Sequence, residues 1–207
     1  MCLENHWLSE PGARHIRSPN VGGPFAGSNP DTIVIHFTDG NSVAAALETL
    51  CDPGKNVSAH VVVGRDGSLT QLVPFDHIAW HAGESSWGAR VKFNYYSLGI
   101  EVQNAGRLVR RGDSFYSSIG TEYPAYQVCE ATHRNELDPT YWHTYSVTQL
   151  EAVNEVCALL VSTYGINHIL GHEEIAPNRK IDPGPAFPLD ILRHRLLYNP
   201  QPPETIA

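Results

Sequence analysis

The chain has 207 residues, of which 42% are hydrophobic and 17% charged, and its formal net charge is −8. This length supports one compact domain with a sizeable core and leaves no room for a second domain of similar size. The acidic balance argues against nucleic acid as the main partner, because neutralising phosphates needs a basic surface.

The start of the chain carries no signal pattern, and its cysteines say little about the redox compartment. The first six residues lack the basic start and apolar run of a secretory signal, and no apolar segment is long enough to cross a bilayer. We therefore expect a soluble chain with no membrane span. Four widely spaced cysteines form no C-x-x-C pair, so disulfides stay open, and Cys157 is expected in a helix core.

The first half of the chain reads as a surface arm followed by strands. Residues 1–30 are rich in Pro, Gly, Ser and Asn, which is typical of an arm wrapped over the surface. The β-branched apolar run at 32–37 predicts a buried strand that ends at His36. Ser42 can cap a helix over 43–50. Asp66-Gly67 between the apolar runs 59–63 and 69–73 predicts a β-hairpin.

The second half alternates regular elements with one long insertion. Residues 97–103 predict a strand with Leu98, Ile100 and Val102 on one side and Glu101 on the other. Residues 107–145 show no sustained period and are expected to form an irregular insertion, of the kind that tends to be functional or disordered.

Regular structure is then expected to return. Ser146 to Gln149 is a capping box that predicts a helix over 147–164, ended by Gly165. A strand at 168–170 would deliver His172 at its end, and Pro188 would open a final helix to about Leu197. Together these elements predict a single α/β domain over 31–198 with a central mixed β-sheet flanked by helices, and a tail over 199–207.

Three residues have the chemistry of a zinc site. A catalytic zinc takes three protein ligands, often neutral imidazoles and a carboxylate, and keeps one position open for water. His36, His172 and Asp182 supply that set. Taken singly, each also has an ordinary interpretation, as a core or surface histidine or as a turn aspartate before Pro183. The zinc interpretation requires the strands that end at His36 and His172 to be neighbours, which the sequence alone does not show.

Five spaced motifs add a resemblance to a known family. They are Ile-His-Phe-Thr at 35–38, Ser-Ala-His at 58–60, Ala-Trp-His-Ala-Gly at 79–83, Ser-Leu-Gly-Ile-Glu at 97–101 and the segment 171–185. In this order they resemble the zinc-dependent N-acetylmuramoyl-L-alanine amidases of the AmpD type, which share their fold with peptidoglycan recognition proteins. The resemblance extends from about Thr32 to Leu197 and leaves out the arm and much of the 107–145 insertion.

The resemblance implies hydrolysis of the amide between N-acetylmuramic acid and L-alanine in peptidoglycan or its fragments. It implies one Zn²⁺ per chain, bound by His36, His172 and Asp182, with Glu101 as general base and Lys180 beside the developing oxyanion. The chemistry agrees, because a carboxylate can carry the proton of the attacking water and a cation near the metal can stabilise the oxyanion. Without the motifs, Glu101 and Lys180 would be ordinary surface charges.

The substrate contacts are less closely defined by the sequence. Trp80 and His81 resemble the groove wall of the family, although Trp80 could be core and His81 a hydrogen-bonded loop residue. Asn94 could contact the sugar or cap a turn. Arg107, with its basic neighbours Arg110 and Arg111, could pair with stem-peptide carboxylates or form a solvated patch.

Two function classes follow from these residues. The first is the amidase, and the alternative is a peptidoglycan-binding receptor that uses the same groove without turnover. The complete set of ligands, with Glu101 and Lys180, favours the enzyme. No G-x-S-x-G or H-E-x-x-H element supports a serine hydrolase or another zinc peptidase. The oligomeric state, and a location in the cytoplasm or at the cell wall, are left open.

Overall fold

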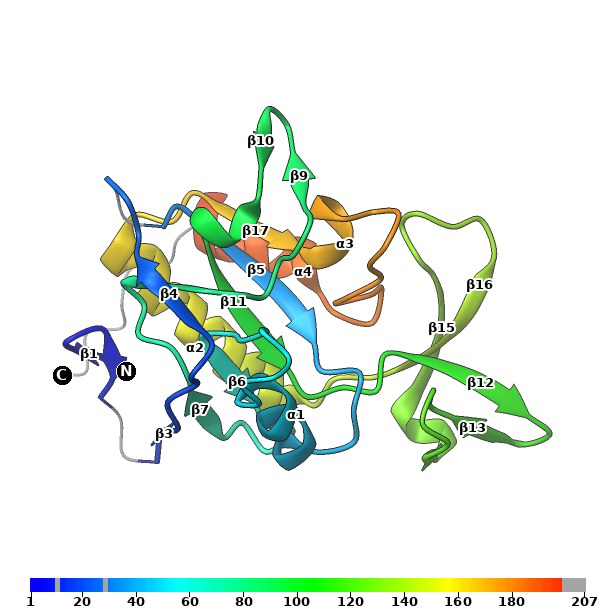
Figure 1. Ribbon diagram of the computed structural model, residues 1–207. Helices are drawn as coiled ribbons and strands as arrows, with labels where there is room; N and C mark the ends of the chain where they lie inside the picture. Colours follow the sequence, from blue (N-terminus) through cyan, green and yellow to red (C-terminus); the bar gives the residue numbers. More distant parts are fainter. Residues whose placement is uncertain (10–11, 28–29, 199–207) are drawn as a thin grey trace, which may run out of the picture.

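The computed structural model describes residues 1–9, 12–27 and 30–198. The tail expected at 199–207 lies outside the described residues. The body is a six-stranded mixed sheet in the order β17-β5-β11-β6-β7-β3 (Figure 1). These strands are β3 (Arg14–His15), β5 (Thr32–Phe37), β6 (Val61–Val63), β7 (Leu69–Gln71), β11 (Ser97–Val102) and β17 (His168–Gly171). The predicted α/β domain with a central mixed sheet is confirmed.

The strand directions bring the ends of several strands to the edge of the sheet where the site lies. Strands β17, β5, β11 and β6 run parallel to one another, whereas β7 is antiparallel to β6. The predicted hairpin over 59–73 is the β6–β7 pair, and its turn contains Gly67 with φ of +81°. Each parallel neighbour therefore ends at the same edge as β5, which is the edge that carries His36.

Helix α2 (Val147–Tyr164) covers one face of the sheet, with the bounds that the sequence predicts. Its capping box is formed, since the Ser146 side chain accepts from the Gln149 backbone while the Gln149 side chain accepts from the Ser146 backbone, and Gly165 ends the helix in the left-handed conformation. The apolar face of α2 packs on alternate residues of the central strands. The buried contributors from the helix are Val153, Val156, Cys157 and Leu160.

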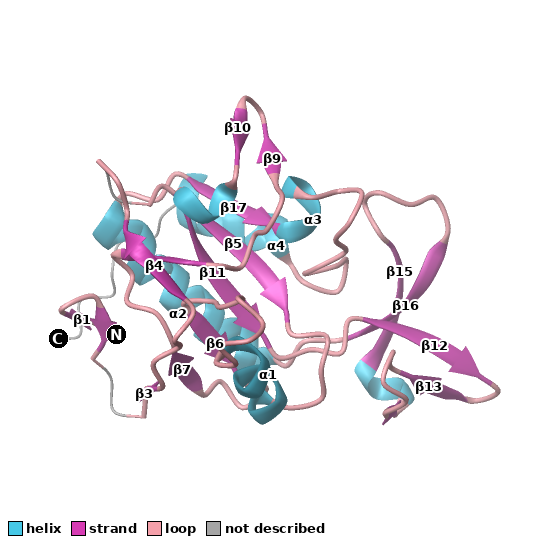
Figure 2. Cartoon of the chain, viewed as in Figure 1, coloured by secondary structure: helices cyan, strands magenta, loops and turns pink. Residues whose placement is uncertain are grey.

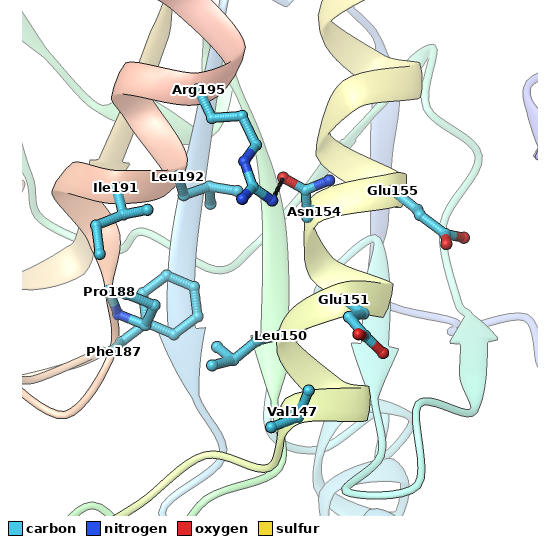
Figure 3. A pocket seen from close by; sticks show the side chains of 10 residues that line it. All are labelled: Val147, Leu150, Glu151, Asn154, Glu155, Phe187, Pro188, Ile191, Leu192 and Arg195. Atoms are coloured by element: carbon cyan, nitrogen blue, oxygen red, sulfur yellow. Dashed lines mark hydrogen bonds between the residues drawn. The ribbon is translucent and has the colours of Figure 1, made fainter. Parts of the chain in front are cut away.

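The C-terminal helices lie on the same side as α2. Helix α4 (Leu189–Arg193) continues into the π-helical turn η3 (His194–Tyr198), close to the predicted end of the final helix. A shallow groove runs between α2 and α4, and Figure 3 shows Leu150, Phe187 and Leu192 along its floor and Arg195 beside Asn154 at one end. The opposite face of the sheet is covered in part by α1 (Val43–Leu50), which Ser42 caps as predicted.

The described part of the expected arm is joined to the body. Strand β3 forms the outer edge of the main sheet, β4 (Val21–Pro24) pairs with β8 (His77–Ala79), and β1 (Leu3–Glu4) pairs with β2 (Trp7–Leu8). Leu8 is 1% exposed and belongs to the main core. Its backbone N–H donates to the Gln71 side chain at 2.7 Å. This segment therefore contributes to the core as well as to the surface.

The prediction that the insertion is irregular is wrong, because the insertion forms a regular antiparallel sheet. Its strands have the order β14-β13-β12-β16-β15 and stand apart from the helix-flanked body (Figure 2). They are β12 (Arg107–Arg111), β13 (Ser114–Tyr116), β14 (Glu122–Tyr123), β15 (Val128–Thr132) and β16 (Pro139–His143), with the 3₁₀ turn η2 (Ala125–Gln127) before β15. The apolar alternation is weak because this small sheet buries few side chains, chiefly Leu108, Tyr123, Trp142 and His143, and one of these is polar.

Several short elements complete the fold around the site. The hairpin of β9 (Ser86–Trp87) and β10 (Arg90–Val91) precedes the 3₁₀ turn η1 (Phe93–Tyr95), and the single-turn helix α3 (His172–Ile175) follows β17 directly. Cys157 is buried, as predicted, and the cysteines are free. In the described part of the chain, no helix is both long and apolar enough to cross a membrane.

The packing of α2 on the sheet generates a stability prediction. Leu160 is fully buried against the central strands, so Leu160→Ala should lower the free energy of unfolding by about 2–5 kcal/mol, through lost burial and the cavity left behind. Leu137→Ala is the matched control, because Leu137 is 95% exposed and should change stability by less than about 0.5 kcal/mol. Urea unfolding followed by circular dichroism measures both, and equal losses would contradict this packing.

Candidate metal centre

His36 reaches the site because β5 alternates between two faces of the sheet. Ile33 and Ile35 belong to the core under α2, so Val34 and His36 point to the opposite face. His36 is the penultimate residue of the strand and is 1% exposed. A histidine therefore stands at the carboxyl edge of the sheet, on the face that α2 does not cover.

The neighbouring strand brings the second histidine to the same point. Strand β17 pairs with β5 in parallel, with Gly171 opposite Ile35, so the next residue, His172, lies beside His36. The adjacency that the zinc interpretation requires is thus present. Asp182 follows from the loop after α3, where its carbonyl accepts from the Glu173 backbone N–H at 2.8 Å.

Three side-chain atoms converge closely. His36 Nδ1 lies 2.9 Å from His172 Nδ1, and Asp182 Oδ2 lies 3.0 Å from each of these nitrogens. All three residues are buried, and together they form the cluster able to hold a metal ion among the described residues. The edges of a tetrahedral zinc site, with bonds of about 2.0–2.2 Å, are about 3.3 Å long, so the triangle needs to widen by only about 0.3–0.4 Å to fit.

The hydrogen bonds on the far side of each imidazole fix its tautomer. His36 Nε2 lies 2.9 Å from His81 Nδ1, and His81 Nε2 lies 3.3 Å from the carbonyl of Ser97. The Ser97 carbonyl can only accept, so His81 is protonated at Nε2 and its Nδ1 accepts from His36 Nε2–H. His36 Nδ1 then carries a lone pair toward the cluster.

The same reasoning holds for the second ligand. His172 Nε2 lies 3.1 Å from the carbonyl of Ala82, which can only accept, so the proton of His172 is on Nε2. Arg179 Nη2 also lies 3.4 Å from His172 Nε2, but its two hydrogens donate to the carbonyls of Ala82 and Glu84 at 2.9 and 2.8 Å, so it leaves the bond to Ala82 intact. Two imidazole lone pairs and a carboxylate oxygen therefore face one another with no proton between them, an arrangement that a cation stabilises.

The pKa values of His36 and Asp182 agree with a neutral imidazole beside an ionised carboxyl. Burial, followed by the proximity of His172, lowers the pKa of His36 to about 4. Burial and its histidine neighbours also lower the pKa of His81 well below its usual value. Burial alone would raise the pKa of Asp182, but the proximity of His172 and His36 more than offsets it and lowers that pKa.

Glu101 lies next to His36 on the other side. Strand β11 pairs with β5 in parallel, with Glu101 directly opposite His36, so the two side chains share a face. Oε2 of Glu101 is buried and accepts no hydrogen bond from the described residues. Burial, reinforced by the charge of Asp182, raises the pKa of Glu101 well above its usual value, whereas Lys180 lowers it. This carboxyl therefore has a free oxygen and an increased affinity for a proton.

Lys180 acts on the same group of charges. It lies two residues before Asp182, and its charge lowers the pKa values of both Glu101 and His36. Its backbone N–H donates to the Ala176 carbonyl at 2.9 Å, which anchors this part of the loop to the end of α3. The structure thus brings all five residues proposed for the metal and the chemistry to one place.

The other predicted site residues have defined contacts. His81 orients His36 through the hydrogen bond between their rings. Asn94 fixes the position of His81, because the Asn94 Oδ1 accepts from the backbone N–H groups of His81 and Ala82 at 3.0 and 2.7 Å. Trp80 is half-buried and its ring meets that of Tyr95 edge-on. Arg107 donates to Glu136 at 2.6 Å and lies over the Trp142 ring at 4.8 Å, so one edge and one face of its guanidinium have partners in the insertion.

The geometry has counterparts in known proteins. Residues 26–185 match the family described as N-acetylmuramoyl-L-alanine amidase. The 1,6-anhydro-N-acetylmuramyl-L-alanine amidase AmpD of Citrobacter freundii is 33% identical over 97% of this chain and 96% of its own length. The chain belongs to the N-acetylmuramoyl-L-alanine amidase family. Its predicted resemblance to the AmpD type is thereby confirmed.

Solved structures of the family share the fold. A crystal structure of a selenomethionine derivative of AmpD superposes with a TM-score of 0.67 at 30% identity, covering 95% of this chain and 99% of that one. The amidase AmiD from Escherichia coli, in complex with anhydro-N-acetylmuramic acid-L-Ala-D-gamma-Glu-L-Lys, gives a TM-score of 0.58 at 28% identity and covers 84% of this chain and 57% of that one.

Several residues that support the site are missed by reasoning from the sequence. Gly99 makes room for His81, since a Cβ at position 99 would lie 2.4 Å from the His81 ring. His60 fixes the same spot, because its Nδ1 accepts from the Gly99 backbone at 2.9 Å and its Nε2 donates to the His77 carbonyl. Gly99 and His60 both lie in the family motifs, which was a signal that they have a role, although the motifs do not say which.

Gly99 supplies a test of this arrangement. Gly99→Ala should push the His81 ring off His36, because the new methyl group would overlap the ring and the strand cannot move aside. We expect metal affinity to fall at least tenfold, as for the loss of other groups that orient metal ligands, measured by competition with a chelator. Gly23→Ala is the control, since a Cβ there meets nothing within 4 Å and its affinity should match the parent.

Proposed function

We propose that this protein hydrolyses the amide between N-acetylmuramic acid and L-alanine in peptidoglycan or its fragments, using one Zn²⁺ bound by His36, His172 and Asp182. The observation that carries the proposal is the convergence of three unprotonated ligand atoms beside the buried, unpaired Oε2 of Glu101. Family membership supports the reaction, since AmpD and AmiD are both named as amidases of muramyl-L-alanine bonds.

The donor set supports zinc over harder cations. Two imidazole nitrogens and one carboxylate oxygen form a usual ligand set for catalytic zinc, whereas Mg²⁺ and Ca²⁺ prefer all-oxygen sites. The ion, when bound, would act as a Lewis acid that polarises the amide carbonyl and lowers the pKa of a water molecule. His81 and the Ala82 carbonyl orient the ligands by holding the Nε2 protons of His36 and His172.

Glu101 and Lys180 complete the chemistry. Glu101 is placed to accept the proton of the attacking water at Oε2 and to deliver it to the amine nitrogen of the departing L-alanine, and its raised pKa suits both steps. Lys180 supplies a positive charge beside the same carboxylate, where it can stabilise the tetrahedral oxyanion.

The substrate is proposed to lie along the surface next to the cluster. A groove beside Arg179 runs between the β9–β10 hairpin and the end of α3, and it is lined by residues 83–86, 91–92 and 175–179. The half-exposed Trp80 and Tyr95 offer aromatic faces of the kind that pack on sugar rings. The contacts of His81 and Asn94 favour a role in orienting His36. Arg107, which is paired with Glu136, is a proposed contact to the stem peptide.

The function predicts a defined product and a metal requirement. Purified protein incubated with muropeptides, with and without the 1,6-anhydro group, should release an intact stem peptide that begins with L-alanine. Activity should vanish on chelation and return with Zn²⁺, as followed by mass spectrometry. Glu101→Gln should keep zinc and lose at least about a hundredfold in kcat, whereas His172→Ala should lose the metal itself. Muropeptide that stays intact but bound would instead favour the receptor.

Lys180 generates a pH prediction. The general base must be ionised, so activity falls as the pH drops through the pKa of Glu101. Because Lys180 lowers that pKa, Lys180→Met should shift the acid limb of the kcat profile to higher pH. We also expect kcat at the optimum to fall by about a hundredfold through lost oxyanion stabilisation. Lys55→Met, at an exposed lysine in the loop after α1, should leave the profile in place, and an acid limb unmoved in Lys180→Met would refute the assigned role.

A further inference from the structure

One buried hydrogen-bonded pair has no part in the chemistry above. His133 Nε2 lies 2.7 Å from Glu173 Oε2, and the two residues are 1% and 5% exposed. His133 comes from the loop between β15 and β16 of the insertion, whereas Glu173 follows the ligand His172 in the sequence. A buried donor or acceptor that loses its partner destabilises the fold, so this pair links the insertion firmly to α3.

Glu173 connects the segments that carry two of the ligands. Its Oε2 also accepts from the backbone N–H of Gly184 at 3.2 Å, and its own backbone N–H donates to the carbonyl of Asp182 at 2.8 Å. A single residue therefore holds the loop on both sides of Pro183 and is covalently joined to His172. The distance between the ligand atoms of His172 and Asp182 depends on where Glu173 lies.

The insertion makes two further contacts with the same loop. The Tyr145 hydroxyl, just after β16, donates to the carbonyl of Pro183 at 2.8 Å. The Trp142 ring packs so closely on Gly184 that a Cβ there would lie 2.8 Å from it, and His133 stacks on Trp142 at a centroid distance of 5.7 Å. In Figure 1 the loop joining β15 and β16 lies next to the chain that leaves α3.

We propose that the insertion is a positioning element for the metal-ligand loop, and that His133 is its positioning residue, acting through Glu173 on the relative placement of His172 and Asp182. Asn135 supports the same contact, because its Nδ2 donates to the Glu173 carbonyl at 3.2 Å. This inference rests on the proposed metal function, since the quantity that His133 is expected to change is the affinity for zinc.

The first test is a pair of histidine variants. His133→Asn cannot reach Glu173 and should weaken Zn²⁺ binding about tenfold, the lower end of the effect expected for groups behind metal ligands. His143→Asn is the matched control, because His143 is equally buried in the insertion but accepts from the Ala105 backbone and touches no residue of the ligand loop in the contacts described. Affinity is measured by chelator competition on protein that circular dichroism shows to be folded.

The second test separates positioning from general destabilisation. Glu173→Gln keeps an acceptor for His133 and Gly184 and should hold zinc within about threefold of the parent, whereas Glu173→Ala should lose about tenfold. This pair decides the matter if His133→Asn fails to fold. Unchanged affinity in His133→Asn, or equal affinities in the two Glu173 variants, overturns the inference. A parent protein that binds no zinc overturns the proposed function instead.

Discussion

The site depends on the position of β5 between two parallel neighbours. Because β17 and β11 both run parallel to β5, their carboxyl ends stop at the same edge, and the register sets His172 and Glu101 on either side of His36. A shift of one residue in β5 would turn His36 into the core under α2 and bring Ile35 to the site. The apolar residues of β5, which must stay under the helix, thereby fix the position of a polar ligand.

The burial of polar side chains explains why this edge of the sheet needs so many hydrogen bonds. Buried polar groups are stable when each donor and acceptor is satisfied, and the histidine chain through His36, His81 and Ser97 satisfies all but the Nδ1 atom that faces the cluster. The Ala82 carbonyl does the same for His172. Neutral imidazoles are thus held with their lone pairs directed at one point. The hydrogen bonds of the protein itself therefore order these ligands for the ion.

The features that the sequence predicts well are local ones. The capping box at Ser146 and the Asp66-Gly67 turn are decided by neighbouring residues, so α2 and the β6–β7 hairpin appear where expected. The metal ligands were predicted from residue chemistry and motif order, but their meeting depends on strand adjacency, which is not local. The roles of His81 and Asn94 in orienting His36 also required coordinates, because a side chain that holds another side chain leaves no spacing pattern.

The strands of the insertion are not predicted by local sequence signals, and yet they contact the metal-ligand loop. Its strands are short and half-exposed, so the alternation that would mark them is diluted, although the turn at Gly112, with φ of +62°, is a usable signal of the β12–β13 hairpin. Helix α3 is a single turn and the segment after it has no regular structure, so only a few backbone hydrogen bonds of their own hold the two ligands. Their placement therefore depends also on what packs against them. The contacts of Tyr145, Trp142 and His133 supply that packing, which makes the outlying sheet part of the site.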